Sequence, residues 1–271
     1  MTNESTYTRQ RRAEKMGEAP CLTVAKVGIV SRDYRHRYEN GFRDFSHMLP
    51  RVLALLDEKG CDTVLFSLFS IIARSPFRFS IHTRHLRHIK SVLYEEFTDG
   101  SKRKVKRFVV FCRSADRWKE YPLEQKFGSL KDKKEAEILD FVDKELPQRI
   151  LGNCCILLCG ESNGVKYSRS DKSVHDVFGL RRAIPKQASI ILNPIHDRMT
   201  RFEMAKKREF LSRNGRWVIS VWNKGKEGKN GKTRDGRLPA WTVFHNGVAK
   251  EIESIPNRLG LEIGILDVAE S

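Results

Sequence analysis

Residues 150–164 read ILGNCCILLCGESNG, an apolar run that ends at Cys159 and is followed at once by a polar, glycine-containing segment. A run of this length and composition fits a strand buried on both faces. Open α/β sheets place ligands in the turns that follow the carboxyl ends of such strands. A cysteine there can act as a nucleophile when a neighbouring group takes its proton. Cys159 is therefore a candidate catalytic residue, although an inert core thiol, like those of Cys154 and Cys155, fits the same pattern.

The segments around this run alternate between two hydrophobic periods. Apolar, β-branched runs predict strands over Leu22–Val30, Thr63–Phe69, Phe108–Cys112, Ser189–Asn193, Arg216–Trp222 and Trp241–Phe244. Helical spacing predicts helices over Phe42–Lys59, Thr83–Glu96, Lys131–Glu145 and Arg201–Ser212. Alternation of this kind favours one layered α/β domain over residues 21–271. Residues 1–20 are polar, and we expect them to form a disordered or loosely docked tail.

Composition limits the functional classes. Six cysteines in 271 residues are too few for a disulfide scaffold. No apolar run approaches ~20 residues, so we expect no membrane span, and the first twenty residues lack the apolar core of a secretory leader. We therefore expect a cytoplasmic protein with free thiols. A net charge of +17 favours a polyanionic partner, either a nucleic acid or an acidic protein.

The basic residues concentrate between residues 74 and 117, where twelve Lys or Arg face four Asp or Glu. Arg84, Arg87 and His88 share one face of the helix expected there. The candidate nucleic-acid contacts are Arg84, Arg87, Lys102, Arg103 and Lys104. A solvated helix face and a solvated hairpin turn explain the same charges, and no known nucleic-acid-binding module is present in the sequence.

The sequence contains no metal or nucleotide motif. Cys154, Cys155 and Cys159 lack the spacing of a zinc site, and the next histidines, His175 and His196, follow too far along the chain. No glycine-rich phosphate-binding loop is present. We expect neither a metal nor a cofactor.

Several segments match a family pattern in order. A strand that ends in cysteine is followed by a strand ending in Asn-Pro, a basic helix and a strand ending in Asn. The segments that match are KVGIV (26–30), GCDTVLF (60–66), ILLCGE (156–161), ASIILNP (188–194), RWVISVWNKG (216–225) and WTVFHNG (241–247). This order resembles the carbon–nitrogen hydrolase superfamily of nitrilases and amidases over residues 24–247. The resemblance implies an α/β fold, the nitrilase-like four-layer α-β-β-α sandwich, and a homo-oligomer.

The resemblance also implies a Glu–Lys–Cys triad that hydrolyses a small amide or nitrile. Cys159 matches the nucleophile and Lys119 the lysine that stabilises the oxyanion, with Lys126 as the alternative lysine. Glu124 matches a second acidic residue that members of the family often carry.

The general base is where this sequence departs from the family. The family has Phe-Pro-Glu where this chain has Phe66-Ser67-Leu68, and neither Ser67 nor Leu68 can take a proton from a thiol. Glu161 is the candidate replacement, unless it has a capping or ion-pair role; the other candidates are His82, His85 and His88.

Two functions follow from these observations. The first is a divergent carbon–nitrogen hydrolase that uses Cys159, Lys119 and Glu161. The second is a catalytically inactive nitrilase-like module that binds a ligand or nucleic acid through its basic surface within a larger assembly.

Overall fold

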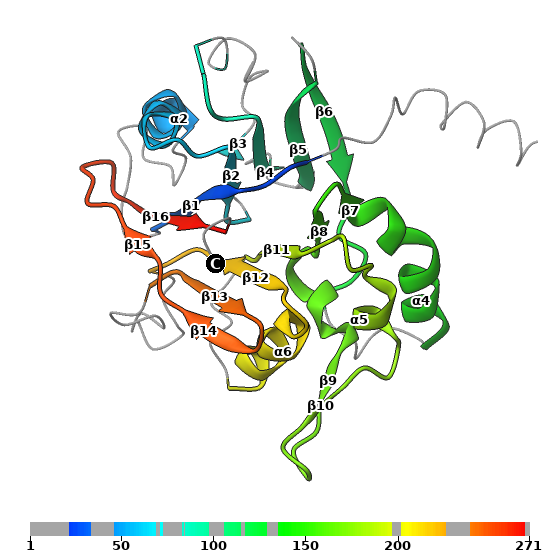
Figure 1. The fold of residues 1–271 in the computed structure, drawn as a ribbon. Helices are drawn as coiled ribbons and strands as arrows, with labels where there is room; N and C mark the ends of the chain where they lie inside the picture. The colour runs from blue at the N-terminus through cyan, green and yellow to red at the C-terminus, as the bar shows by residue number, and fades with distance from the viewer. Residues whose placement is uncertain are drawn as a thin grey trace, which may run out of the picture.

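The computed structural model describes residues 22–33, 46–68, 71–72, 83, 85–97, 106–114, 117–128, 135–196, 202–225 and 239–268. Within these ranges the chain is a mixed α/β structure built on two β-sheets (Figure 1). In this described part, no helix is long and apolar enough to cross a membrane.

The first sheet contains eight strands among the described residues, in the order β15-β16-β1-β2-β4-β5-β6, with β3 paired to β4. Strands β1, β2 and β4 run parallel, and the remaining pairs are antiparallel apart from β3 with β4. The bounds are β1 Lys26–Arg32, β2 Thr63–Phe66, β3 Ile71–Ile72, β4 Ser91–Phe97, β5 Lys106–Ser114, β6 Arg117–Leu123, β15 Glu253–Ser254 and β16 Leu261–Asp267.

The second sheet contains six strands in the described ranges, in the order β14-β13-β12-β11-β8-β7, and its strands β8, β11 and β12 run parallel. Its strands are β7 Ile150–Leu151, β8 Cys154–Ile156, β11 Ile190–Pro194, β12 Trp217–Val221, β13 Trp241–His245 and β14 Val248–Lys250. A separate hairpin joins β9 Lys166–Tyr167 and β10 Val174–His175.

The helices are short. The α-helices are α2 Leu49–Glu58, α4 Glu135–Asp140, α5 Leu180–Ala183 and α6 Phe202–Ser212. A π-helical turn, η2 Phe141–Glu145, continues α4, and the 3₁₀ turns are η1 Ser46–Met48, η3 Leu146–Arg149 and η4 Cys159–Gly164.

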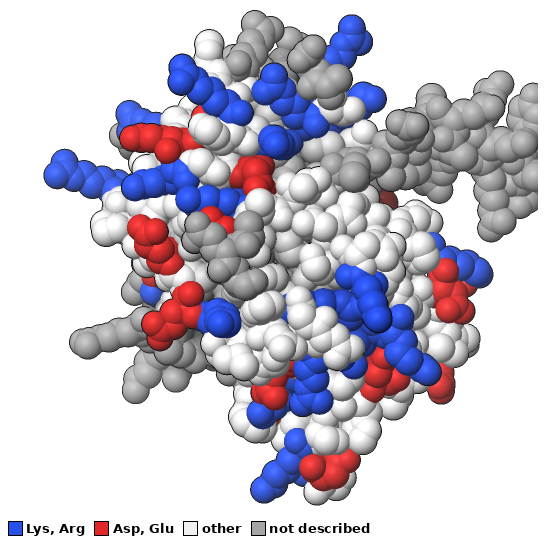
Figure 2. Space-filling view, viewed as in Figure 1, with Lys and Arg blue, Asp and Glu red and all other residues white. Residues whose placement is uncertain are grey.

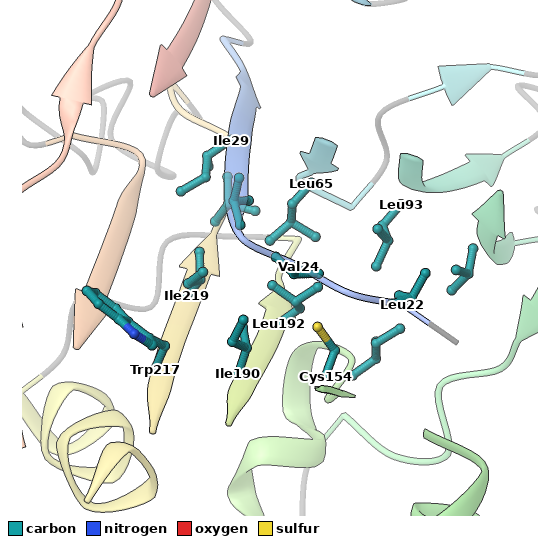
Figure 3. Close-up of a cluster of buried hydrophobic side chains, with 14 of the residues drawn as sticks. Leu22, Val24, Ile29, Leu65, Leu93, Cys154, Ile190, Leu192, Trp217 and Ile219 are labelled. Atoms are coloured by element: carbon teal, nitrogen blue, oxygen red, sulfur yellow. The ribbon is translucent and has the colours of Figure 1, made fainter. Parts of the chain in front are cut away.

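Three hydrophobic clusters hold these elements together. The first draws side chains from both sheets, including Ile29 and Leu65 of one and Leu192 and Ile219 of the other, which face one another in Figure 3. The second joins the first sheet to α2, and the third joins the second sheet to α4, α5 and α6. The sheets therefore pack against each other, and each carries helices on its other face.

Close packing of α2 depends on Gly28 of β1. A Cβ atom at this position would lie 2.8 Å from both δ-carbons of Leu56. The absent side chain therefore lets the helix approach the strand closely.

The carboxyl ends of the parallel strands of the two sheets meet. The backbone N–H of Leu68, after β2, donates to the carbonyl oxygen of Ile195, after β11, at 3.3 Å. The N–H of Lys224, after β12, donates to the carbonyl oxygen of Arg32 in β1 at 2.7 Å. Side chains that follow these strands are thereby brought to one place.

Most of the expected elements in the described ranges are confirmed. Strands β11, β12 and β13 match the strands expected over Ser189–Asn193, Arg216–Trp222 and Trp241–Phe244 to within one residue at their carboxyl ends, and α6 matches the helix expected over Arg201–Ser212. The tail at residues 1–20 lies outside the described residues.

The helix predicted over Thr83–Glu96 is wrong, because residues 91–97 form β4. Before the strand, the N–H groups of residues 87–89 donate to the carboxylate of Asp57 at 2.7–3.1 Å. Leu86, Ile89 and Val92 do share a surface, as helical spacing suggested, but they share it as an extended segment packed into the second cluster. Tertiary contacts therefore override the local period here.

Candidate functional site

Cys159 lies in a tight strand-to-helix turn. It follows β8 after two residues and is the first residue of η4. Its φ is 39°, in the left-handed region that side-chain-bearing residues seldom adopt. A comparable strained turn between a strand and a helix presents the nucleophile of α/β-hydrolases.

The next residue, Gly160, allows this turn to form. A Cβ atom at Gly160 would lie 2.0 Å from the carbonyl oxygen of Gly128, so only glycine fits without displacing backbone. The backbone around the thiol is thus fixed by close packing.

Cys159 differs from the other described cysteines in exposure. Cys61, Cys112, Cys154 and Cys155 are buried, whereas Cys159 is partly exposed. Burial raises the pKa of Cys61 and of Cys155 to about 12 and that of Cys112 to about 11, and it raises the pKa of Cys154 as well. These four thiols are therefore unsuited to form thiolates near neutral pH.

His196 follows β11 and connects Cys159 to a carboxylate. Its Nε2 atom lies 3.0 Å from Oε2 and 3.3 Å from Oε1 of Glu95, and Cys159 is close enough to raise the pKa of its imidazole. Burial opposes the imidazolium, but the hydrogen bonds and charges of Cys159 and Glu95 outweigh it and raise the pKa of His196 to about 9. Such a cysteine–histidine–carboxylate chain is an arrangement that activates thiol nucleophiles.

Glu95 reaches this position from β4. Side chains alternate along a strand, so Glu95 shares with Leu93 the face that packs toward the second sheet. β2 pairs with β4 in parallel, with Leu65 opposite Leu93, and continuing this register by two residues sets Glu95 level with Ser67. The carboxylate therefore stands one strand away from the position where the family pattern expects one.

Asn223, after β12, fixes the backbone around His196. Its Nδ2 atom donates to the carbonyl oxygens of His196 at 2.9 Å and of Leu68 at 2.7 Å, while its Oδ1 accepts a bond from Ser67 Oγ at 2.8 Å. Asn223 is buried, and its three partner atoms belong to residues at the meeting point of the two sheets. It is a positioning residue for the histidine.

Arg208 places a buried positive charge near Cys159. It lies on α6, which packs against η4, and it is fully buried. Desolvation lowers the pKa of Arg208 to about 10, while the negative form of Cys159 opposes that shift. The guanidinium carbon lies 5.5 Å from the ring centroid of Trp222, and Nη1 donates to Thr242 Oγ1 at 2.9 Å.

Glu161 is fully buried in a different set of contacts. Its Oε1 accepts bonds from Arg149 Nη2 and from the backbone N–H of Lys126, both at 2.9 Å. Its Oε2 accepts the backbone N–H of Leu158 at 2.8 Å, which caps the start of η4. Every carboxylate oxygen is thus engaged in holding the turn, and the ion pair and cap considered from the sequence are both present.

Lys119 lies on β6, away from this group. Through the strand register, Glu95 is level with Phe108 and Leu123, whereas Lys119 is level with Cys112 and Ser91. Four residues along the strand separate the two levels, about 13 Å. The side chain of Lys119 is exposed, and no contact between its ammonium and Cys159 is found among the described residues.

The two neighbouring candidates are also placed elsewhere. The Lys126 ammonium lies 3.2 Å from a carboxylate oxygen of Glu145. The carbonyl oxygen of Glu124 accepts a bond from Arg149, and its side chain is exposed.

The candidate nucleic-acid contacts can be placed only in part. Arg84 and Lys102, Arg103 and Lys104 lie outside the described residues, as does His82. Arg87 is exposed, but it belongs to an irregular segment, so the helix face proposed for it with His88 is wrong. His85 and His88 are exposed there too. On the face shown in Figure 2, Lys and Arg are interspersed with Asp and Glu.

Sequence reasoning missed Glu95, His196 and Arg208. Strand alternation over residues 91–97 would have placed Glu95 on the inward face beside Leu93. His196 lies two residues after the Asn193-Pro194 pair, at a strand end of the kind that carries ligands. Nothing in the sequence indicated that Arg208 would be the buried member of a basic helix.

No group of three or more His, Cys, Asp or Glu side chains suited to holding a metal ion occurs within the described ranges.

No known family model matches the chain, and no curated protein matches it in sequence. Among solved structures, the chain is similar to a CN-hydrolase superfamily protein from Xanthomonas campestris whose crystal structure has an arsenic adduct in the active site. The sequence identity is 12%, the TM-score is 0.48, and the alignment covers 92% of this chain and 94% of the other.

Proposed function

We propose that this chain is a cysteine-dependent carbon–nitrogen hydrolase in which Cys159 is the nucleophile, His196 transfers the proton and Glu95 orients the histidine. The observation that carries the proposal is the position of His196, 3.0 Å from Glu95 and close enough to Cys159 for that side chain to favour its imidazolium. The packing of two sheets with helices on their other faces supports the four-layer α-β-β-α arrangement as the scaffold.

The reaction would proceed in two stages on an amide. The Cys159 thiolate attacks the carbonyl carbon, His196 gives its proton to the leaving nitrogen, and the carbon–nitrogen bond breaks to leave a thioester and a free amine. His196 then takes a proton from water, the hydroxide attacks the thioester, and the carbon–sulfur bond breaks to release a carboxylic acid and restore the thiolate.

The charges of the site suit this sequence. A pKa of about 9 keeps His196 protonated at neutral pH, as the first stage requires of a general acid. Glu95 has a side chain only 6% exposed, and its carboxylate holds the imidazole in one orientation and stabilises its positive form. This scheme does not need Glu161 as a proton carrier, and it assigns no step to Lys119, which the sequence suggested as the oxyanion stabiliser.

The test measures ammonia release from a panel of primary amides and nitriles, and the mass of enzyme quenched in acid during turnover. We expect release that is lost in Cys159→Ala, reduced at least about 10²-fold in His196→Gln, and retained in Cys154→Ala, a matched change at a buried thiol. A thioester mass on the peptide containing Cys159 is the expected intermediate. Equal ammonia release by wild type and Cys159→Ala would overturn the proposal.

A further inference from the structure

Arg208 has unsatisfied donors in a fully buried position. Its Nη1 atom donates to Thr242 Oγ1, but in the described part of the chain neither Nε nor Nη2 has an acceptor. The N–H groups of these two atoms point along one edge of the guanidinium. Such an edge can bind the two oxygens of a carboxylate through two parallel hydrogen bonds. Elsewhere in this protein, Arg107 uses the same two nitrogens to hold a carboxylate, both donating to Glu96 Oε2.

Within the described ranges no carboxylate forms an ion pair with Arg208, and the charged group that favours its guanidinium is the ionised side chain of Cys159. A buried cation without a counter-ion is costly to the fold. The ring of Trp222 stabilises the guanidinium of Arg208 by a cation–π contact. The buried Nε1 of Trp222 likewise has no acceptor among the described residues. Unused donors on two adjoining side chains point to a ligand that supplies acceptors.

The location of this edge links it to the proposed nucleophile. Arg208 lies on α6, α6 packs against η4, and η4 begins at Cys159. An anion bound by Arg208 would therefore be held beside the group that reacts. The edge is enclosed, which favours a planar anion with two oxygens over a phosphate, whose further oxygens would be buried without donors.

We propose that Arg208 binds a carboxylate of the substrate, so that the substrate is an amide or nitrile that also carries a carboxylate group. The inference rests on the proposed function, because it assigns the substrate class of the Cys159 site.

The test compares two alkylating reagents that differ in charge. Iodoacetate carries a carboxylate and iodoacetamide does not, and the alkylation rate of Cys159 with each is measured by peptide mass spectrometry. The ratio of the iodoacetate rate to the iodoacetamide rate is compared with that of the same cysteine in the urea-unfolded chain. A change that only alters the thiolate population moves both rates together and leaves the ratio unchanged.

We expect the folded protein to have the higher ratio, and Arg208→Gln to lower it about tenfold, which is the effect of 1.4 kcal/mol in binding. Arg208→Lys keeps the charge without the two-donor edge and should give an intermediate ratio. Arg213→Gln removes one positive charge from the exposed end of the same helix and is the matched control, with an unchanged ratio. An equal ratio in wild type and Arg208→Gln would overturn the inference and leave the proposed function intact.

A second measurement needs no variant. Sodium acetate should protect Cys159 of the wild-type protein from iodoacetamide, whereas acetamide at the same concentration and ionic strength should not. Absence of protection, with Cys159 otherwise reactive, also overturns the inference. A Cys159 that reacts with neither reagent faster than the unfolded chain contradicts the proposed function itself.

Discussion

His196 Nε2 lies 3.0 Å from Glu95 Oε2, although 101 residues separate them in sequence and they come from different sheets. Side-chain alternation along β4 places Glu95 on the face toward the second sheet, and His196 lies just after the carboxyl end of β11. Because Cys159 also favours the imidazolium of His196, this contact links three chemically active side chains. Its effect on protonation is measurable without knowledge of the substrate.

The first expected outcome concerns the titration of His196. Its imidazole should titrate with a pKa of about 9 in the wild-type protein, observed by NMR of ¹³C-labelled histidine. Glu95→Gln removes one of the negative charges that favour the imidazolium, so it should lower this pKa toward the ordinary value of about 6.5. Cys159→Ala should also lower it, while Cys154→Ala should not. A wild-type titration near 6.5 would show that the three side chains are not coupled.

The same raised pKa makes stability depend on pH. The imidazolium of His196 should stabilise the folded state fully below pH 6.5, and this contribution should disappear as the pH rises through about 9. The free energy of unfolding of the wild-type protein in urea should therefore exceed that of His196→Gln by an amount that shrinks between pH 6 and pH 10. The decrease in this difference should be on the order of 2–3 kcal/mol. A difference between the two proteins that stays constant or grows over this range would contradict the assignment.

A third outcome concerns Lys119. Because the strand register sets it about 13 Å along the sheet from the level of Glu95, Lys119→Ala should leave the alkylation rate of Cys159 within about twofold of wild type. His196→Gln serves as the positive control in the same assay. A loss of alkylation rate in Lys119→Ala as large as that in His196→Gln would show that the lysine belongs to the site, as the family pattern expects.

Glu161 should behave as a structural residue. Glu161→Gln leaves Arg149 buried beside a neutral partner and should destabilise the fold by about 3 kcal/mol or more, measured by urea unfolding. Glu203→Gln, in an exposed pair with Arg169, is the control and should cost about 1 kcal/mol or less.

The paired replacement of Arg149→Met with Glu161→Gln distinguishes this role from a catalytic one. It removes both charges but leaves an amide oxygen to accept the N–H of Leu158. It should therefore recover much of the stability lost in Glu161→Gln and restore the reactivity of Cys159 as well. Recovered stability with an unreactive Cys159 would instead indicate that the Glu161 carboxylate takes part in the chemistry.

The sequence was sufficient to place Cys159 after a buried strand and to predict the main strands of the second sheet. Those predictions succeed because long apolar runs have one stable location, the interior between packed layers. The helix predicted over Thr83–Glu96 fails because its apolar spacing fits either a helix or an extended segment. The choice is made by Asp57, which binds three of its N–H groups from another element.

The wrong helix prediction is also the reason that the sequence does not reveal the role of Glu95. A helix over Thr83–Glu96 gives Glu95 no inward face. The sequence therefore points to Glu161 and to the histidines at 82, 85 and 88 as replacements for the general base. His196 has no local pattern that marks it. Its role follows only from the meeting of β4 and β11, which belong to different sheets, and no short-range signal encodes that meeting.

The most direct test of the account is the rate at which iodoacetamide alkylates each cysteine of the native protein, in a Cys21→Ser background. We expect Cys159 to react at least about tenfold faster at pH 7 than Cys61, Cys112, Cys154 or Cys155, because those thiols are buried with raised pKa values. We expect His196→Gln to remove that advantage. Uniformly slow alkylation of all five cysteines, unchanged in His196→Gln, would contradict the central claim that His196 and Glu95 activate Cys159.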